Sequence, residues 1–418
     1  MILFQGRILP NEEQEKAISS LTDSISVTLS NPPLERKKVI AACARLSLRA
    51  ERGEFDAIAK PLLEMAHLPY ETYLEYARMF AGEGLQKKVE LELAGLPLKE
   101  EQIGPHLFRR VAPLGVLMHI AAGNVDVLPA YSVIEGLLAG NINILKLPSG
   151  DKGLSVKLLD ELIKEEPSLA PYIYVFDVPS YEVETMKQLA HQADAVVVWG
   201  GDAAVKGARS LAEPNCHLIE WGHKLSFAYA TPSSSDEELH RLAKDICVSN
   251  QVLCSSCQGI YLDSEKEEEI SAFAERIFAI LCEENLSVGK AALGMRAKSA
   301  LSVYNERLEK KGKVYSQDGV SLIVYPDEEL QLSFLFRNVW LKKLPASRII
   351  PVLKPYHGYL QSCALLGKKE EKERLLPLLI QAGVNRIVDG NLSFMDAGES
   401  HDGRYPLREY TKIVDIRK

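Results

Sequence analysis

A cysteine at a predicted helix-to-strand junction is the side chain of this sequence best suited to covalent chemistry. Cys254 lies in the segment 249–262, which reads S-N-Q-V-L-C-S-S-C-Q-G-I-Y-L. A helical pattern over 236–247 precedes it, and the apolar run 259–262 predicts a strand after it. Small and polar neighbours favour partial exposure of a thiol, and its reactivity then depends on thiolate formation. A single cysteine is more often a small buried hydrophobic residue. The assignment of Cys254 as a nucleophile therefore needs further evidence from the rest of the chain.

The C-x-x-C spacing of Cys254 and Cys257 admits two other chemistries, a zinc site and a dithiol redox pair. No second C-x-x-C and no Cys or His pair at ligand spacing accompanies it. The flanking residues also differ from a thioredoxin-like turn. The sequence therefore predicts no metal site.

A second segment with chemical potential reads A-A-G-N-V over 121–125, between a predicted strand and a predicted helix. The small residues Ala121, Ala122 and Gly123 let a ligand approach the backbone closely, so we assign them to cofactor binding. The side chain of Asn124 offers N–H donors that can hold an oxyanion, an effect worth about 3–4 kcal/mol in kcat. Capping of the following helix is the alternative role for Asn124.

Two further strand ends carry groups that suit a nucleotide. K-L-P-S places the Lys146 cation and the Ser149 hydroxyl where they can meet ribose hydroxyls or a phosphate, although a surface lysine is the simpler interpretation. W-G-G-D places Trp199, Gly200 and Gly201 before a helix, whose first N–H groups bind phosphate oxygens. Gly-Gly is also an ordinary turn. No G-x-G-x-x-G follows the first strand and no P-loop occurs, so a dinucleotide would bind in a different manner.

E-W-G-H-K over 220–224 places a carboxylate at the end of a predicted buried strand. Such a group tends to have a raised pKa and can exchange protons near neutrality, which makes Glu220 a candidate acid–base residue. A surface ion pair with Lys224 is the alternative. Gly222 lies at the same strand end and is a candidate cofactor contact.

These motifs are connected by an alternation of strands and helices. Residues 11–95 read as amphipathic helices covering a sheet, and from 115 onward strands alternate with helices. Alternation of this kind predicts βαβ units and a parallel sheet, with ligands bound beyond the carboxyl ends of the strands. A second alternating region follows 227, and the tail 408–416 reads as an extended edge strand. The expected strands are 115–121, 141–146, 172–177, 195–199, 217–220, 259–262, 321–325, 339–342, 359–366 and 384–389.

Composition restricts the class of protein. The chain has 418 residues, of which 46% are hydrophobic and 25% charged, with a formal net charge of −8. Basic residues are not grouped, so no nucleic-acid partner is expected. No apolar run reaches the roughly 18–20 residues of a membrane span, and residues 1–10 lack the pattern of a signal peptide. The seven cysteines read as cytosolic thiols, which predicts a cytoplasmic protein.

Taken together, these motifs resemble the aldehyde dehydrogenase superfamily, and more closely the LuxC-type fatty acyl-CoA reductases, from about residue 108 to 418. In this resemblance Asn124 stands for the oxyanion-hole Asn, and Lys146 for the Lys that touches the adenosine ribose. Glu220 stands for the Glu of E-L-G-G-K, and Cys254 for the nucleophile. Cys254 follows Glu220 by 34 residues (254 − 220), which is the usual separation in the superfamily. H-D-G-R-Y-P-L and E-Y-T-K-I-V near the end of the chain also look like this family.

The resemblance implies an α/β, aldehyde dehydrogenase-like fold with two Rossmann-like parallel-sheet domains and an N-terminal helical layer. The expected boundaries are 1–105 for the helical part, 106–224 for the dinucleotide-binding domain and 225–398 for the catalytic domain with the nucleophilic Cys. Residues 399–418 form an extended tail that we expect to act as an oligomerisation strand in a homo-oligomer.

The activity that the resemblance implies is NADPH-dependent reduction of a long-chain acyl-CoA to the aldehyde through a thioester on Cys254. Ser149 stands where NAD-preferring relatives carry a Glu, which favours NADPH over NADH. An acyl-protein synthetase or a thioesterase is the partner suggested by the family. Two alternatives stay open: an NAD(P)-dependent aldehyde dehydrogenase that forms acids or acyl-CoA, and a non-catalytic subunit that scaffolds acyl transfer.

The sequence also departs from the superfamily. Asn124-Val-Asp-Val replaces the N-x-P turn after the oxyanion residue. Many aldehyde dehydrogenases hold the nicotinamide ribose with a second Glu. At about that place the chain reads R-N-V-W over 337–340, with Arg337 where a carboxylate is expected.

Overall fold

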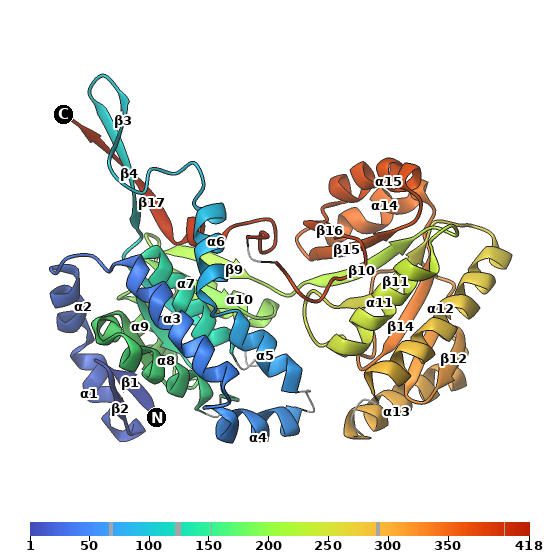
Figure 1. Cartoon of the computed structure of the whole chain (residues 1–418), viewed down its shortest axis with the longest axis horizontal. Coiled ribbons are helices and arrows are strands. Elements are labelled where there is room, and N and C mark those ends of the chain that lie inside the picture. The colour runs from blue at the N-terminus through green and yellow to red at the C-terminus, as the bar shows by residue number, and fades with distance from the viewer. Residues whose placement is uncertain (67–69, 122–126, 152, 290–292, 397) are drawn as a thin grey trace. The chain divides into compact units, whose positions relative to one another are not determined.

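The computed structural model describes residues 1–66, 70–121, 127–151, 153–289, 293–396 and 398–418 (Figure 1). The chain divides into two compact units. Unit 1 comprises Met1–Gly222 with Ala397–Lys418, and unit 2 comprises His223–Asp396. The tail of the chain therefore belongs to the same unit as its beginning.

Unit 1 is built on a mixed sheet with the strand order β2-β1-β7-β6-β5-β8-β9. The central strands pair in parallel, and β1 pairs with β7 in the antiparallel direction. Their buried apolar runs are typical of parallel strands covered by helices on both faces. The strands are β1 (Ile2–Phe4), β2 (Arg7–Leu9), β5 (Val116–Ile120), β6 (Ile142–Lys146), β7 (Ile173–Phe176), β8 (Ala195–Trp199) and β9 (His217–Trp221).

Helices connect these strands and cover the sheet. The crossover helices are α7 (Leu128–Ala139), α8 (Leu154–Glu165), α9 (Val183–Ala190) and α10 (Asp202–Leu211). The N-terminal helices are α1 (Gln14–Ser19), α2 (Leu21–Leu29), α3 (Arg36–Glu51), α4 (Asp56–Ala66), α5 (Tyr70–Arg78) and α6 (Gly82–Glu92). Short 3-10 turns lie at η1 (Asn11–Glu13) and η2 (Pro167–Tyr172).

The strand order of unit 1 contains a topological switch point between β5 and β8. The chain runs from β5 through β6 to β7 on one side, and then returns to β8 and β9 on the other side. Ligands of open α/β sheets bind at such a point, outside the carboxyl ends of the strands. The segments that begin at Ala121 and at Trp199 leave the sheet there.

A small antiparallel sheet holds the C-terminal tail. Its order is β17-β4-β3, with β17 (Thr411–Arg417), β4 (Leu107–Pro113) and β3 (Glu101–Gly104). The short helix α16 (Pro406–Glu409) leads into β17. The tail thus forms an edge strand within its own chain, and its role in an oligomer stays a prediction.

Unit 2 repeats the arrangement, with the order β12-β13-β14-β11-β10-β15-β16 (Figure 1). Apart from β12, which is antiparallel to β13, the strands pair in parallel. The strands are β10 (Leu225–Ala230), β11 (Cys257–Leu262), β12 (Lys313–Gln317), β13 (Val320–Tyr325), β14 (Asn338–Lys343), β15 (Leu360–Leu366) and β16 (Arg386–Val388). The helices are α11 (Asp236–Ser249), α12 (Glu267–Val288), α13 (Leu293–Glu309), α14 (Ile349–Leu353) and α15 (Lys369–Ala382), with 3-10 turns η3 (Ala346–Arg348) and η4 (Lys354–Tyr356). Within the described residues, no helix combines the length and the apolarity that crossing a lipid bilayer requires.

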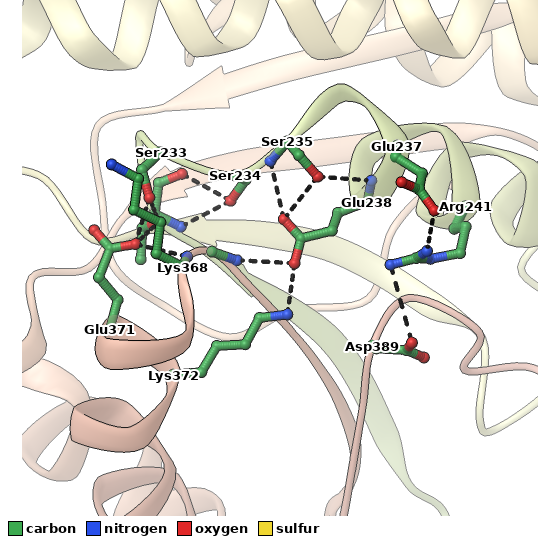
Figure 2. Close-up of polar contacts among 12 residues, drawn as sticks. Ser233, Ser234, Ser235, Glu237, Glu238, Arg241, Lys368, Glu371, Lys372 and Asp389 are labelled. Atoms are coloured by element: carbon green, nitrogen blue, oxygen red, sulfur yellow. Dashed lines mark hydrogen bonds and ion pairs between the residues drawn. The ribbon is translucent and has the colours of Figure 1, made fainter.

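Unit 2 also has a switch point, between β10 and β15, but side chains of the unit itself engage the donors there. Glu371 Oε2 accepts hydrogen bonds from Thr231 Oγ1 at 2.9 Å, from Lys368 N at 2.9 Å and from Ser233 Oγ (Figure 2). Hydroxyl and N–H donors at such a crevice are groups that bind phosphate. In unit 2 the Glu371 carboxylate already accepts hydrogen bonds from these donors.

A second carboxylate, that of Glu238, accepts hydrogen bonds from other donors at the same carboxyl edge. Glu238 Oε1 accepts from Gly367 N at 3.2 Å and from Lys372 Nζ at 2.5 Å. Glu238 Oε2 accepts from Ser235 N at 2.9 Å, while Ser235 Oγ accepts from Glu238 N at 3.3 Å (Figure 2). This capping box starts α11. The carboxyl edge of unit 2 is therefore a structural junction, and the analogous edge of unit 1 is the better candidate for a nucleotide.

Candidate active site

Cys254 lies on the loop between α11 and β11, at the amino edge of the unit 2 sheet. Asn250, with φ 48°, ends α11 in the left-handed conformation, and Gln251 follows with φ 61°. Two successive non-glycine residues in this region are uncommon, and such strain gathers at functional sites. The turn directs the chain away from the helix axis before Cys254. The predicted exposure of this thiol is observed, since Cys254 is exposed.

The remaining six cysteines, all within the described residues, are buried or partly buried. Burial raises the pKa of Cys43 and of Cys247 to about 12. Burial also raises the pKa of Cys257, whose Sγ donates to the Gly259 carbonyl at 3.2 Å. The two thiols of the C-x-x-C segment thus differ sharply in environment. Among the described residues, no group of three or more His, Cys, Asp or Glu side chains is placed to hold a metal ion.

Hydrogen bonds from neighbouring strands fix the loop that carries Cys254. The Ser226 hydroxyl on β10 donates to the Cys254 carbonyl at 2.9 Å and accepts from Ser362 N on β15 at 3.1 Å. Ser256 N donates to the Leu253 carbonyl at 3.0 Å, which closes a tight turn around the cysteine. The backbone at Cys254 is therefore tied to two adjacent strands of the sheet.

A buried carboxylate, that of Asp245, also supports this loop. Ser255 Oγ donates to the Ser393 carbonyl at 2.8 Å. Ser393 in turn donates its N–H to Asp245 Oδ1 at 3.0 Å and its hydroxyl to Asp245 Oδ2 at 2.8 Å. Burial raises the pKa of Asp245 to about 6.

This raised pKa predicts a pH dependence of stability. Because the folded state holds the Asp245 proton up to a higher pH than the unfolded chain, where the pKa is about 3.9, stability falls as pH rises from about 4 to about 6. The expected loss is about 3 kcal/mol in the free energy of unfolding. Asp245→Asn removes this loss. In urea unfolding, the free energy of unfolding of the variant should therefore rise relative to that of the wild type between pH 4 and pH 7.

The matched control is Asp236→Asn on the same helix, because the Asp236 side chain is 71% exposed. We expect its pH profile to follow the wild type. A wild-type profile that is parallel to that of Asp245→Asn would contradict the assignment.

A third support joins the Cys254 loop to the segment 335–338. Leu335, Phe336 and Arg337 have φ values of 59°, 51° and 70°, a left-handed run without glycine. Phe336 N donates to the Asn250 carbonyl at 2.9 Å, and Asn338 N donates to Gln251 Oε1 at 2.9 Å. These hydrogen bonds join the turn at Asn250 and Gln251 to the turn at 335–337.

Arg337 completes this junction. Its side chain is buried, and Nε donates to Asn250 Oδ1 at 3.0 Å while an amino group donates to Asn285 Oδ1 at 2.5 Å and to the Gly289 carbonyl at 2.6 Å. Burial lowers its pKa. In the sequence, Arg337 stands where a ribose-binding carboxylate is expected. In the structure, its hydrogen bonds hold the turn that precedes Cys254.

In unit 1 the predicted nucleotide residues lie at the carboxyl edge of the sheet. Lys146 is the last residue of β6, is buried, and donates from Nζ to Ser180 Oγ at 3.0 Å. Burial lowers its pKa, with Asp177 opposing that effect. Ser149 is exposed in the turn that follows.

The Trp199–Gly201 segment lies at the switch point. A Cβ on Gly200 would come within 2.9 Å of the Ala204 Cβ, whereas a Cβ on Gly201 would meet nothing within 4 Å. Among the described residues no side chain caps α10, which starts after Gly201. Free N–H groups at a helix start are the groups that bind phosphate, and the phosphate site proposed from W-G-G-D stays a prediction. Gly222 is partly exposed after β9.

The Trp199 side chain itself is engaged in packing. Its indole N–H donates to Ser132 Oγ at 3.0 Å, and its ring stacks on Trp221 with centroids 5.4 Å apart. The ring of His401 lies 5.0 Å from that of Trp199 and 5.1 Å from that of Trp221. Only the backbone of Trp199 is thus available for a cofactor.

Behind the switch point, a buried polar chain links β5, β6 and α7. His119 places Nδ1 2.7 Å from Ser132 Oγ and Nε2 3.0 Å from Asn143 Oδ1. Burial lowers the pKa of His119 to about 4, so the imidazole is neutral at pH 7. These side chains hold α7, the helix that follows the predicted oxyanion segment.

Glu220 on β9 is held by arginines that the sequence analysis did not single out. Its carboxylate forms a bidentate pair with Arg209 of α10, at 2.5 and 2.7 Å, and this pairing raises the pKa of Arg209. Arg404 donates to the Glu220 carbonyl at 2.5 Å and lies over the Trp221 ring at 4.5 Å. Arg404 and His401 come from H-D-G-R-Y-P-L, so this motif is the signal that could have found them.

Three of the predicted residues, Ala122, Gly123 and Asn124, lie outside the described residues. Ala121, directly before them, is buried at the end of β5. Their assigned roles stay predictions.

Comparison with known proteins decides the family. The family model "Acyl-CoA reductase (LuxC)" matches residues 38–413. The chain belongs to the LuxC family of acyl-CoA reductases. Membership confirms the predicted resemblance and makes this LuxC-family chain an oxidoreductase acting on the aldehyde or oxo group.

Curated relatives agree with this assignment. The chain is 25% identical over 343 residues to a long-chain acyl-protein thioester reductase of Vibrio harveyi, covering 78% of this chain and 69% of the relative. It is 28% identical over 352 residues to the protein of the same name from Photorhabdus laumondii, covering 79% of this chain and 70% of the relative.

Solved structures confirm the predicted aldehyde dehydrogenase-like α/β fold. Methylmalonate-semialdehyde dehydrogenase from Oceanimonas doudoroffii is similar with a TM-score of 0.76 at 14% identity, over 100% of this chain and 98% of that one. The glyceraldehyde-3-phosphate dehydrogenase GapN of Methanocaldococcus jannaschii, solved with NADP, gives a TM-score of 0.71 at 12% identity, over 99% and 96%.

Proposed function

We propose that this LuxC-family protein reduces a long-chain acyl thioester to the aldehyde with NADPH, through a thioester on Cys254. The observation that carries the proposal is the placement of Cys254. It is the exposed member of the seven cysteines, and it lies on a strained loop tied to β10, β15 and the 335–338 segment. The names of the curated relatives supply the long acyl chain and the thioester.

The covalent step balances as an acyl transfer. The Cys254 thiolate attacks the carbonyl carbon of the substrate thioester, a new S–C bond forms, and the bond to the carrier sulfur breaks, so the carrier leaves as a thiol after taking a proton. Asn124 and the Cys254 backbone N–H are the proposed donors to the oxyanion. Glu220 is the proposed proton-handling residue, held in place by Arg209.

The residues of unit 1 fit a nicotinamide dinucleotide. Lys146 and Ser149 would hold the adenosine ribose, and the uncapped start of α10 beyond Gly200 would hold a phosphate. The reduced nicotinamide supplies the hydride when bound. Ser149 in place of a carboxylate favours the 2′-phosphate of NADPH, and the GapN neighbour solved with NADP supports a cofactor of this class.

Lys146 provides a direct test of the cofactor site. Replacing it by Met removes a charged hydrogen-bond donor worth about 1.5–3 kcal/mol, so KM for NADPH should rise about 10–100-fold with a smaller change in kcat. The control is Lys187→Met, because Lys187 is exposed on α9 and pairs with Glu184. Equal KM values for both variants would remove Lys146 from the cofactor site.

The proposed function itself is tested with a panel of acyl-CoA and acyl-protein thioesters, each offered with NADPH and with NADH and followed by nicotinamide absorbance. We expect NADPH oxidation and aldehyde formation that increase with acyl-chain length. Oxidation of aldehydes to acids without any thioester reduction would instead establish the aldehyde dehydrogenase alternative.

A further inference from the structure

A cavity of about 370 Å³ lies at the carboxyl edge of the unit 2 sheet, away from the junction that Glu238 and Glu371 form at β10 and β15. Its walls are the ends of β13 and β14, the first turn of α12, and the turn from α13 into β12. Small-molecule sites occupy about 300–1,000 Å³, and in open α/β sheets they lie outside the carboxyl ends of the strands. The size and the place of this cavity therefore suit a small ligand.

The lining of the cavity is rich in lysine. Four lysines line it, and Glu267 is the acidic residue of its described lining. These side chains are charged at pH 7, so four lysines and one glutamate give the lining a formal charge of +3. The chain as a whole carries −8. A positive cavity in an acidic chain points to an anionic ligand. The four lysines are Lys310, Lys311, Lys313 and Lys343.

Two of these lysines have carboxylate partners. Lys311 Nζ lies 2.5 Å from Glu309 Oε2, and Lys343 Nζ lies 3.6 Å from Glu267 Oε1. The Glu267 side chain is 80% exposed, so its pair with Lys343 is weak. These carboxylates offset the charge of Lys311 and part of the charge of Lys343.

The other two lysines, Lys310 and Lys313, form no ion pair with the residues that the structure describes. The Lys313 ammonium lies 4.8 Å from the centroid of the Tyr315 ring, and Glu275 acts on it from beyond ion-pair distance. A phosphate monoester carries about −1.5 to −2 charges at pH 7 and accepts strong hydrogen bonds from ammonium groups. One such group in the cavity would therefore neutralise both lysines.

The turn K-K-G-K over 310–313 is held by its backbone. Lys310 has φ 53°, the left-handed conformation that glycine usually adopts after a helix. A Cβ on Gly312 would come within 2.5 Å of the Val324 carbonyl oxygen, so only glycine fits there. Lys313 then pairs with Val324 where β12 begins. The backbone that carries the lysines is thus packed against β13, which limits the ordering that ligand binding requires.

Much of the remaining lining is apolar or aromatic. Ile270 of α12, Val324 and Tyr325 of β13, Pro326 and Tyr315 contribute it. A bare phosphate ion would leave these walls in contact with water, whereas a phosphate ester with an apolar or aromatic body would cover them. The lining thus favours an ester over the free ion.

The cavity is separate from Cys254. The cysteine lies at the amino edge of the same sheet, before β11, whereas the cavity lies at the carboxyl ends of β13 and β14. Strand β14 has 6 residues, and at about 3.3 Å per residue it spans about 17 Å. A small ligand in the cavity therefore does not reach the thiol.

We propose that this cavity is a second ligand site, which binds a small phosphate monoester with an apolar or aromatic body. Lys310 and Lys313 hold the phosphate, and Tyr315 and Tyr325 contact the body. Binding involves no covalent step and no turnover, so the site is independent of the reductase chemistry at Cys254.

The probe for this site is phenyl phosphate, titrated into the full chain by isothermal calorimetry. Lys310→Met/Lys313→Met should raise its Kd at least about tenfold, because a hydrogen bond to a charged group contributes about tenfold or more to affinity. Glu267→Gln should lower the Kd, by up to about fivefold, because it removes the opposing carboxylate from the lining. Phenol, which lacks the phosphate, should not bind.

The matched control is Lys244→Met/Lys369→Met, which removes the same two charges from exposed positions on α11 and α15 of the same unit. We expect the wild-type Kd for it. Equal Kd values for the wild type and for Lys310→Met/Lys313→Met would overturn the proposal. Loss of binding in Lys146→Met instead would also overturn it, because the phosphate would then belong to unit 1.

A measurement without variants covers the case in which the double substitution fails to fold. Wild-type lysines are acetylated with sulfo-N-hydroxysuccinimide acetate, with and without phenyl phosphate, and the peptides are quantified by mass spectrometry. Protection of Lys310 and Lys313 relative to Lys244 and Lys369 supports the site. Uniform acetylation of the four lysines would reject it.

The same labelling separates a soluble ester from a lipid headgroup. Phosphatidylcholine vesicles with phosphatidic acid replace phenyl phosphate in the second arm. Protection by phenyl phosphate and not by the vesicles supports a soluble ligand. Protection by the vesicles alone would contradict the proposal, because the phosphate would then come from a membrane surface.

Discussion

Cys254→Ala should abolish thioester reduction, with kcat falling by about 10⁶-fold, the size of effect seen when the nucleophile of a hydrolase is removed. The other thiols within the described residues cannot replace it, because they are buried or partly buried. Binding of NADPH should be retained, since the residues proposed to hold it belong to unit 1. Steady-state kinetics gives the first quantity, and quenching of nicotinamide fluorescence gives the second.

Cys282→Ala is the matched control for this substitution. Cys282 lies on α12 of the same unit, is partly buried, and has a pKa raised by burial. We expect wild-type rates for it. Iodoacetamide should label Cys254 faster than the other cysteines. A Cys254→Ala protein that still reduces acyl thioesters would refute the covalent route.

The second large effect is expected at Arg337. Arg337→Met keeps the apolar volume but leaves two buried acceptors, on Asn250 and Asn285, and the partly buried Gly289 carbonyl without their donor. An orphaned buried acceptor costs about 1–3 kcal/mol, so we expect a loss of about 3–5 kcal/mol in the free energy of unfolding, measured with urea. Release of the Asn250 turn should also change the alkylation rate of Cys254, which lies four residues further along the chain.

Arg348→Met separates this effect from the loss of any arginine. Arg348 is about half exposed and pairs with Glu328 at 2.9 Å. Surface pairs contribute about 0–1 kcal/mol, and the Cys254 alkylation rate should stay at the wild-type value. Equal destabilisation by both substitutions would mean that Arg337 has no special role in the loop.

The elements next to the candidate site could be predicted because their signals are local. A-V-V-V-W followed by Gly-Gly marks the end of β8 and the start of α10, and the observed bounds Ala195–Trp199 equal the expected ones. S-S-S-D-E-E over 233–238 is a local helix-start signal, and Ser235 forms the capping box of α11. Parallel pairing followed from the alternation itself, so the strand ends that carry Lys146 and Trp199 could be assigned to one edge.

Other parts of the fold had weaker local signals. The hairpin of β1 and β2 turns at Gln5 and Gly6, both with positive φ, and Gln-Gly lacks the Asn-Gly or Asp-Gly signature of such turns. Strand β10 was not predicted, since L-S-F-A-Y-A follows E-W-G-H-K directly and begins at the expected domain boundary between 224 and 225. The antiparallel hairpin of β3 and β4 was missed as well.

The site contacts that were missed are those between distant segments. Arg337 meets Asn250 across 87 residues, and Arg404 meets Glu220 across 184. No helical or strand periodicity reports such a pair. Residue types at the strand ends could therefore be assigned to a site, whereas the side chains that orient them could not.

The most direct test of the central claim is peptide mapping by mass spectrometry after incubation with myristoyl-CoA in the absence of nicotinamide. We predict one myristoyl group per chain, attached through a thioester to the peptide that contains Cys254 and released as myristaldehyde when NADPH is added. An unmodified Cys254 peptide, together with full aldehyde production on addition of NADPH, would contradict the account.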